Sequence, residues 1–295
     1  MPRPYRLCGA ETISIAGVLL AVLIAGFTGC APLVANLHTR GRAMAVLPGS
    51  QSVQVRWQEQ DDALAGQMEP VLTQAMEALK PYGDFTHPVT VYLYPDHQRL
   101  ALATGQLCKP WMVGFGQYAR IHLQSPATWA GKDWRQRFSR LVTHELAHVL
   151  MYQRCCNSWD WFVRDIPFWF REGFASAVAG QGRERQGRGE VRDYYLGGAQ
   201  AGDPLVTGEK VRRTRVSLAY GASHRVFEDF LAVCGPRGVR DIVEAMGEGA
   251  DFDQAFGRVV GFSPREFTDI WRSDLADDLP FASRWRRVFC PGAGQ

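Results

Sequence analysis

The sequence lacks a strong excess of charge of either sign, any visible internal repeat and a large number of cysteines. Its 295 residues contain 33 Lys and Arg against 30 Asp and Glu, a balance too even to indicate a nucleic-acid partner. Seven cysteines are too few for a small domain built on disulfides. A mean hydropathy of -0.18 excludes a polytopic membrane protein. Because 46% of the residues are hydrophobic, the chain is not disordered and can bury a substantial core.

One long apolar run is present, at the N-terminus. Residues 13–27 carry no charge and follow Arg3 and Arg6. This run suits the core of a signal peptide and is shorter than the roughly 20 residues that a membrane-spanning helix needs. The following Phe27-Thr28-Gly29-Cys30 resembles a bacterial lipobox, which implies cleavage before Cys30 and attachment of lipid to that cysteine. An uncleaved signal anchor is the alternative.

The lipobox resemblance implies a location. It places the chain in the bacterial cell envelope, lipid-anchored and facing the periplasm, and Ala31 after the cysteine favours the outer membrane over the inner. We therefore expect a signal peptide at residues 1–29, a tether at 30–50, a folded domain at 51–280 and a C-terminal tail at 281–295.

Export to an oxidising space permits disulfides among the five remaining cysteines. An odd number leaves one thiol free or paired outside the chain. We expect Cys155 and Cys156 not to bond each other, because adjacent cysteines strain the bridge. The expected pairs are Cys108 with one of these two, and Cys234 with Cys290.

The order of the predicted elements indicates an α+β fold, with strands early and helices late. Alternating or β-branched runs predict strands, and apolar residues at helical spacing predict helices. The expected strands are 52–57, 88–94 and 119–124, and the expected helices are 61–80, 133–153, 169–179 and a broken helical stretch up to 279.

Two charged segments follow the helix expected over 169–179. Residues 180–192 are rich in glycine and charge, which predicts a mobile loop. The basic run that follows is either the solvated flank of a loop or a contact for an acidic substrate or lipid headgroup. It consists of Lys210, Arg212, Arg213 and Arg215.

The segment His144-Glu145-Leu146-Ala147-His148 lies within the helix predicted over 133–153. Two histidines four residues apart stand on one face of a helix, so both imidazoles can reach one metal ion. Glu145 is turned away by one residue and can instead act on a water molecule. A pair of surface histidines is the alternative, but the surrounding residues are apolar.

A third ligand is expected from Glu172, at the start of the helix predicted over 169–179. No His or Gly occurs in residues 149–157, which excludes a third ligand shortly after the histidines. Glu172 stands among Phe170, Phe174 and Ala175, where a carboxylate is costly to bury unless a metal or a cation pairs with it. A salt bridge to Arg171 or to another arginine is the alternative.

HELAH followed by P-x-W-x-x-E-G-x-A resembles the gluzincin clan of zinc metallopeptidases, and more narrowly the peptidase MA-like domain of exported bacterial proteins. The resemblance runs from about Val89 to Leu275 and implies a zincin-like domain with a small N-terminal mixed sheet and a helical C-terminal half. It also implies that residues 119–124 form the edge strand of this sheet, which could pair with an extended peptide.

The same resemblance implies the roles of the site residues. His144, His148 and Glu172 would bind Zn²⁺, and Glu145 would act as the general base. Tyr220 is the expected donor to the oxyanion, with His224 as the second choice and core packing as the alternative for Tyr220. The chain departs from the pattern at Ser176, where the best-known gluzincins carry an Asp that orients a zinc-bound His.

The sequence thus predicts a lipid-anchored zinc metallopeptidase that cleaves peptide bonds of a peptide or protein substrate in the envelope. We expect a monomer with no nucleic-acid partner. The alternative function is a non-catalytic zinc-fold lipoprotein that serves as a binding or assembly module. A closed structural zinc site is disfavoured, because three ligands beside a base describe an open site.

Overall fold

The computed structural model describes residues 40–47, 49, 51–107, 109, 111–129 and 133–290. The expected signal peptide and Cys30 lie outside these residues, as does Cys108. Within them, the structure combines a small N-terminal sheet with a mostly helical remainder, so the expected mixture of strands and helices in this order is confirmed. No helix in the described part of the chain is both long enough and apolar enough to cross a membrane.

Five strands form one mixed sheet in the order β1-β2-β3-β5-β4. The pair β1 and β2 is antiparallel, β2, β3 and β5 run parallel, and β4 is antiparallel to β5. The strands are β1 (Arg40–Leu47), β2 (Gln51–Trp57), β3 (Val89–Tyr94), β4 (Gly114–Gly116) and β5 (Arg120–Gln124).

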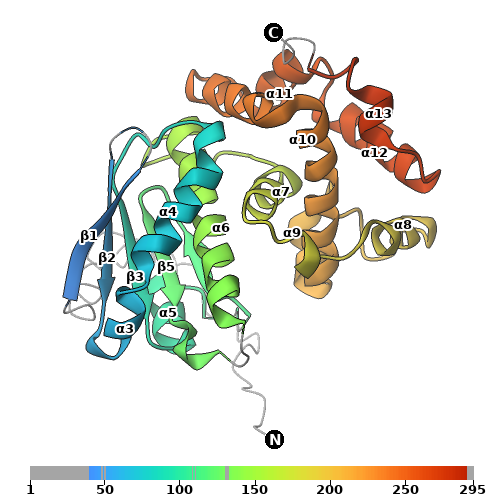
Figure 1. Ribbon diagram of the computed structural model, residues 1–295. Helices are drawn as coiled ribbons and strands as arrows, with labels where there is room; N and C mark the ends of the chain where they lie inside the picture. The colour runs from blue at the N-terminus through green and yellow to red at the C-terminus, as the bar shows by residue number, and fades with distance from the viewer. Residues whose placement is uncertain are drawn as a thin grey trace, which may run out of the picture.

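The alternation of side chains along β3 explains how the sheet is covered. Val89, Val91 and Leu93 point to one face and belong to the main core, which α4 and α6 complete. Tyr94 belongs to a smaller cluster on the other face, together with Leu100 of α5. Figure 1 shows α4 and α6 lying along the same face of the sheet, with the helical part of the molecule beyond α6.

The helices range in length from four residues in α3 to 32 in α10. They are α3 (Asp62–Ala65), α4 (Met68–Leu79), α5 (His97–Thr104), α6 (Trp134–Cys155), α7 (Phe168–Val178), α8 (Arg188–Leu196), α9 (Gly208–Thr214), α10 (Val216–Gly247), α11 (Phe252–Val260), α12 (Pro264–Ala276) and α13 (Phe281–Trp285). Short 3-10 turns occupy Glu59–Asp61, Lys80–Tyr82, Pro126–Thr128 and Gly182–Glu184.

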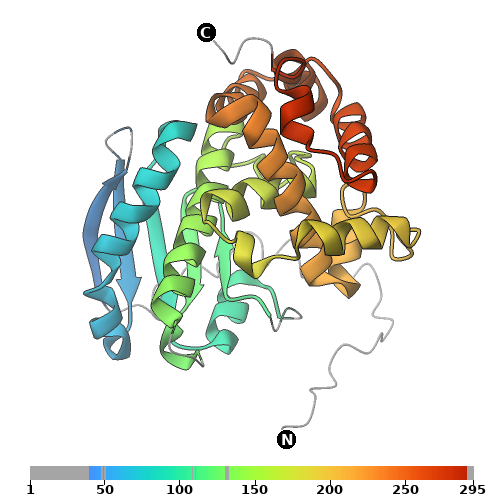
Figure 2. The same cartoon turned by 45° about the vertical axis from the view of Figure 1, so that its right-hand side comes forward.

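The stretch expected to be helical with breaks up to residue 279 is interrupted next to Pro236 and Pro264. Gly235 has φ 63° and ψ -179°, which kinks α10 just before Pro236. Ser263 caps α12 by accepting a hydrogen bond from the backbone N–H of Glu266, and Pro264 occupies the first turn. In Figure 2, the red helices at the C-terminal end of the chain lie on the side of the orange α10 that faces away from the sheet.

Both expected ends of the domain require correction. Residues 40–47 of the expected tether form β1 and pair with β2, which satisfies the backbone groups that face that strand. The expected tail contributes α13, and Phe281 and Phe289 are buried against Phe267. The fold therefore covers at least residues 40–290, more than the expected 51–280.

The expected edge strand is also wrong. Residues 120–124 form β5, but this strand lies between β3 and β4. The edge of the sheet on this side is β4, a strand of three residues of which two are glycine, and β1 forms the opposite edge. Residues 180–192, expected to be a mobile loop, instead contain a 3-10 turn and the first part of α8, whose start is held by a hydrogen bond from the Gly187 N–H to Glu190.

The disulfides agree with one expectation and contradict another. Cys234 pairs with Cys290, which ties α10 to the segment after α13. Cys155 and Cys156 are bonded to each other, contrary to the expectation from strain. The helix α6 ends between them, since Cys155 is its last residue and Cys156 is extended, so the two side chains are not held at helical spacing.

Candidate metal centre and its pocket

Helix α6 brings the two histidines onto one buried face. His144 and His148 are each 7% exposed, and their Nε2 atoms lie 3.2 Å apart. The ring of His148 stacks nearly parallel on that of Tyr152, one turn further along α6, with ring centroids 6.1 Å apart. The alternative of surface histidines is therefore excluded.

Helix α7 supplies Glu172 to the same point. Its Oε2 lies 3.5 Å from Nε2 of His144 and 3.5 Å from Nε2 of His148. Its other oxygen, Oε1, lies 3.4 Å from Nε of Arg171, so the alternative salt bridge is present as well. Burial alone would raise the pKa of Glu172, but the two histidines and Arg171 outweigh it and hold that pKa well below its ordinary value. Glu172 is therefore an anion in the folded protein.

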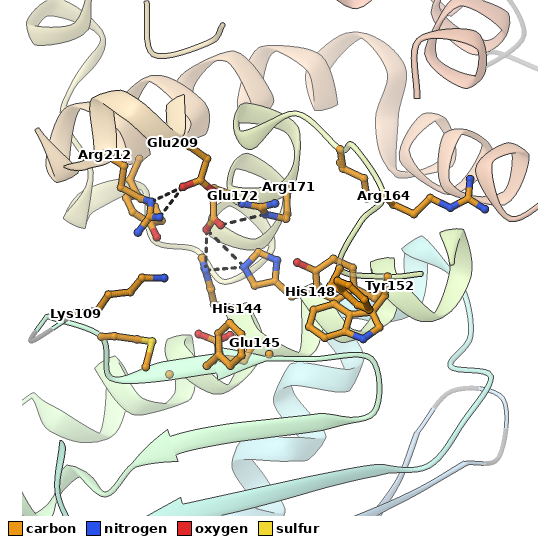
Figure 3. A pocket seen from close by; sticks show the side chains of 18 of the residues that line it. Lys109, His144, Glu145, His148, Tyr152, Arg164, Arg171, Glu172, Glu209 and Arg212 are labelled. Atoms are coloured by element: carbon orange, nitrogen blue, oxygen red, sulfur yellow. Dashed lines mark hydrogen bonds and ion pairs between the residues drawn. The ribbon is translucent and has the colours of Figure 1, made fainter. Parts of the chain in front are cut away.

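The spacing of these three atoms fits a zinc ion. Zn–N and Zn–O bonds are about 2.0–2.2 Å long, and two ligands on a tetrahedral ion then lie about 3.3–3.6 Å apart. The observed separations of 3.2, 3.5 and 3.5 Å form a triangle of nearly this size. Two neutral imidazoles and a carboxylate are also a donor set that Zn²⁺ prefers. The three residues form a potential metal-binding cluster, and Figure 3 shows them converging on one point.

Glu145 lies beside this cluster under the edge strand. It is 6% exposed, and burial is the main reason that its pKa rises to about 7; Glu172 contributes in the same direction. The backbone N–H of Gly116 donates a hydrogen bond to its carboxylate. A Cβ at Gly114 would lie 2.7 Å from Oε1 of Glu145, so β4 can approach α6 this closely only because that position is glycine.

A residue that the sequence did not indicate holds His144. Oε1 of Gln181 accepts a hydrogen bond from Nδ1 of His144 at 3.1 Å and another from Nη2 of Arg185 at 2.5 Å. The Arg185 donor fixes which way the Gln181 amide faces, and this places the His144 proton on Nδ1 and leaves Nε2 free as a ligand. Gln181 thus does the work that the resemblance would assign to an Asp at position 176.

Ser176 belongs to the same hydrogen-bond network through Arg185. Its hydroxyl accepts a hydrogen bond from Nε of Arg185 at 3.1 Å and lies 3.0 Å from Nδ1 of His224. His224 in turn lies 3.1 Å from Glu228. His224, the second choice for an oxyanion donor, does not line the pocket beside the cluster.

Tyr220 does line this pocket. Burial raises the pKa of its hydroxyl above the ordinary value of 10, with Glu172 as a further cause, so the hydroxyl stays protonated and can donate. The guanidinium of Arg185 lies 4.8 Å from the centre of its ring, and Phe168 packs on its edge. Tyr220 therefore both packs against its neighbours and lines the pocket.

The pocket has a volume of about 310 Å³ and opens between β4, α7, α9 and the segment after α6. Apolar side chains from Trp111, Met112, Phe115, Trp161, Phe162 and Ile166 form part of its lining. Charged residues form the rest, and among them Lys109, Arg171, Glu209 and Arg212 lie near the cluster (Figure 3). Of the basic run after residue 209, Arg212 therefore faces a pocket rather than open solvent.

Comparisons with known proteins give only a weak likeness. No family model matches the chain, and no curated protein matches it. Among solved structures, an M1 zinc metallopeptidase from Deinococcus radiodurans aligns over 87% of this chain and 52% of its own, with 16% identity and a TM-score of 0.40. A two-domain M1 zinc metallopeptidase mutant bound to L-tryptophan aligns over 79% of this chain and 51% of its own, with 16% identity and a TM-score of 0.42. The chain thus spans about half the length of these structures, and the likeness is too weak to assign it to a family.

Proposed function

We propose that this chain is a zinc-dependent metallopeptidase of the zincin-like type. The observation that carries the proposal is the triangle of 3.2, 3.5 and 3.5 Å between Nε2 of His144, Nε2 of His148 and Oε2 of Glu172, with the buried carboxylate of Glu145 beside it. Three ligands and an adjacent base are what an open, catalytic zinc site requires.

Each residue has a distinct part in hydrolysis. His144, His148 and Glu172 would hold the ion, which when bound lowers the pKa of water and polarises a carbonyl group. Glu145 accepts a proton from water and returns it to the leaving amine, and a pKa of about 7 suits both transfers at neutral pH. Tyr220 lines the pocket, and its protonated hydroxyl would donate to the negative charge that develops on the substrate's carbonyl oxygen.

The edge strand supports a peptide as the substrate. β4 is the last strand of the sheet in the described part of the chain, and it passes directly over Glu145. An extended peptide that pairs with β4 would run along the pocket, past the carboxylate that acts as the base. This transfers the peptide-binding role expected for residues 119–124 to residues 114–116.

We further propose that the protein works in the bacterial cell envelope, held by lipid on Cys30 and facing the periplasm at the outer membrane. The support is the sequence of residues 3–31 alone. Metabolic labelling with a fatty acid, comparing the parent chain with Cys30→Ala, tests the anchor; equal labelling of the two would contradict it.

Zinc analysis of the purified full chain, combined with a peptide-cleavage assay, tests the catalytic proposal. We expect about one zinc per chain, and we expect Glu145→Gln to keep the zinc while losing at least about 100-fold in kcat. Glu77→Gln is the matched control, because Glu77 is exposed on α4 and should change neither quantity.

The other outcomes separate the two candidate functions. Zinc retained in a parent chain that cleaves no peptide would favour the non-catalytic binding or assembly module. Unchanged cleavage by Glu145→Gln would remove Glu145 as the base. No zinc in either protein would contradict both functions.

A further inference from the structure

Three cationic side chains from separate parts of the chain line the pocket beside the proposed zinc centre. They are Lys109, from the segment between α5 and β4, Arg171 from α7 and Arg212 from α9, and together we call them the cationic wall. Figure 3 shows Lys109 and Arg212 on the same side of the pocket, with the amine of Lys109 extending toward the interior. Catalysis as proposed above uses none of the three.

One carboxylate serves two of these cations. Glu209 Oε1 accepts a hydrogen bond from Nη2 of Arg171 at 2.8 Å, and its Oε2 accepts from Nη2 and Nε of Arg212 at 2.6 and 3.1 Å. The pKa of Glu209 is lowered because these arginines outweigh the effect of burial. Arg171 also pairs with Glu172, so the two guanidinium groups and the two carboxylates balance in charge, and the excess positive charge of the cationic wall comes from Lys109.

Lys109 adds a third positive charge. Within the described part of the chain, no carboxylate lies within ion-pair distance of its amine. Burial lowers the pKa of Lys109 and the charges of Arg212 and Arg171 lower it further, while Glu209 and Glu172 act in the opposite direction, so the carboxylates offset only part of the repulsion from the two arginines. This repulsion is relieved when an anion enters among them.

Two aromatic rings hold the guanidinium group of Arg212 in place before any ligand binds. Its guanidinium lies 5.3 Å from the ring centre of Trp111 and 6.0 Å from that of Phe168. A planar cation fixed in this way loses little conformational entropy when it binds a carboxylate. The cationic wall therefore favours binding of an anion, whereas it would repel a cationic side chain.

We propose that the pocket selects peptides that carry a carboxylate next to the bond to be cleaved, held by Lys109 and Arg212. The inference rests on the proposed function, because it takes the ligand to be a peptide. The carboxylate can come from an Asp or Glu side chain or from the free C-terminus of a chain, and both present the same group to the wall.

Binding to the zinc-loaded Glu145→Gln protein tests the proposal without requiring cleavage. The probes are acetylated pentapeptides made in matched sets, with Glu or Gln at each position in turn and with an acid or an amide at the C-terminus. We expect isothermal titration calorimetry to give Kd values at least about tenfold lower for the carboxylate member of one pair. The pair that shows the difference identifies the source, side chain or chain end.

Variants of the wall make the test specific. Lys109→Gln and Arg212→Gln should each bring the ratio of the two Kd values close to one, and Lys109→Glu should shift the preference toward a Lys-containing peptide. Arg213→Gln is the matched control, since Arg213 is an exposed neighbour on α9 and its loss should leave the ratio unchanged. Lys109 lies outside the helices and strands, so its variants keep the test valid if Arg212→Gln does not fold.

Equal Kd values for acid and amide partners, no binding of any peptide, or an unchanged ratio in both wall variants would overturn the proposal. A carboxylate preference in binding combined with no cleavage by the parent chain would contradict the peptidase function and support the selectivity. Cleavage by the parent chain with no carboxylate preference in binding would support the peptidase function and contradict the selectivity.

Discussion

At the scale of single residues, Glu145 carries a free-energy cost that depends on pH. Its pKa rises from 4.5 to about 7 in the metal-free fold, so the folded state binds this proton more tightly than the unfolded state does. Its contribution to the free energy of unfolding therefore falls as pH rises through the range from about 4.5 to 7, by about 3 kcal/mol in total.

This predicts that Glu145→Gln stabilises the metal-free protein more at pH 8 than at pH 5. Urea unfolding of both proteins with a chelator present would measure it, because groups common to both cancel in the difference. If the difference in the free energy of unfolding is the same at the two pH values, the carboxylate does not have the raised pKa.

Gln181 offers a second prediction at this scale. Gln181→Leu removes the acceptor that fixes the His144 ring, and loss of such a partner weakens metal binding by about 10- to 100-fold. Competition with a chromophoric chelator would measure the zinc Kd. Gln136→Leu, an exposed change on the same helix as His144, serves as the control and should leave the Kd as it is.

The sequence predicts some of these residues and not others for a physical reason. His144 and His148 could be found because their i,i+4 spacing acts within one helix. Gln181 meets His144 across 37 positions of sequence, and Lys109 joins Arg212 across about a hundred, through packing that no local pattern encodes. Glu172 was found because a carboxylate among aromatic residues needs a partner.

At the scale of elements, the contact of α7 with α10 sets the position of Glu172. Gly173 packs so tightly that a Cβ there would lie 2.5 Å from the backbone oxygen of Ser223 and 2.6 Å from Cβ of Phe227. Neither atom can move without shifting α10.

Gly173→Ala should therefore lower the free energy of unfolding by about 1–3 kcal/mol and also weaken zinc binding, because the shift of α7 carries Glu172 with it. Gly189→Ala is the matched control: it lies in α8 with nothing within 4 Å of the added Cβ, so it should be neutral or slightly stabilising. Denaturant unfolding compares the two, and equal effects would contradict the close contact.

The elements themselves were largely predictable, with an informative exception. Residues 133–153 and 169–179 have clear helical periodicity, and both helices are found within two residues of their expected limits. The strand β4 was missed because Gly-Phe-Gly has one side chain in three positions, too few to show alternation. Its glycines reflect the close approach to Glu145, which only the folded structure shows.

At the scale of the whole molecule, the C-terminal segment belongs to the core. Phe281 and Phe289 are buried, and the bond from Cys290 to Cys234 closes a loop over a separation of 56 residues. The sequence predicts a tail there because the apolar residues of the segment are widely spaced, and their partners lie in earlier helices, such as Phe267 of α12 and Val260 of α11.

Breaking this bond with Cys290→Ser should lower the free energy of unfolding by about 2–4 kcal/mol, since the unfolded chain regains the freedom that the loop denies it. The double variant Cys234→Ser with Cys290→Ser should lose no more than the single one, because there is one bond to break. Thermal unfolding under oxidising conditions would show this, and a Tm equal to that of the parent would contradict it.

The division of the three proposed ligands between α6 and α7 has a consequence for how the molecule matures. In an unfolded chain, 24 positions separate His148 from Glu172, so a complete donor set exists only once the two helices have docked. An ion bound there would link α6, which packs on the sheet, to α7, which packs on α10. Free zinc in the surroundings would then favour the folded form by mass action, adding about 1.4 kcal/mol for each tenfold rise above its Kd. A chain kept from metal would be the form most open to proteolysis.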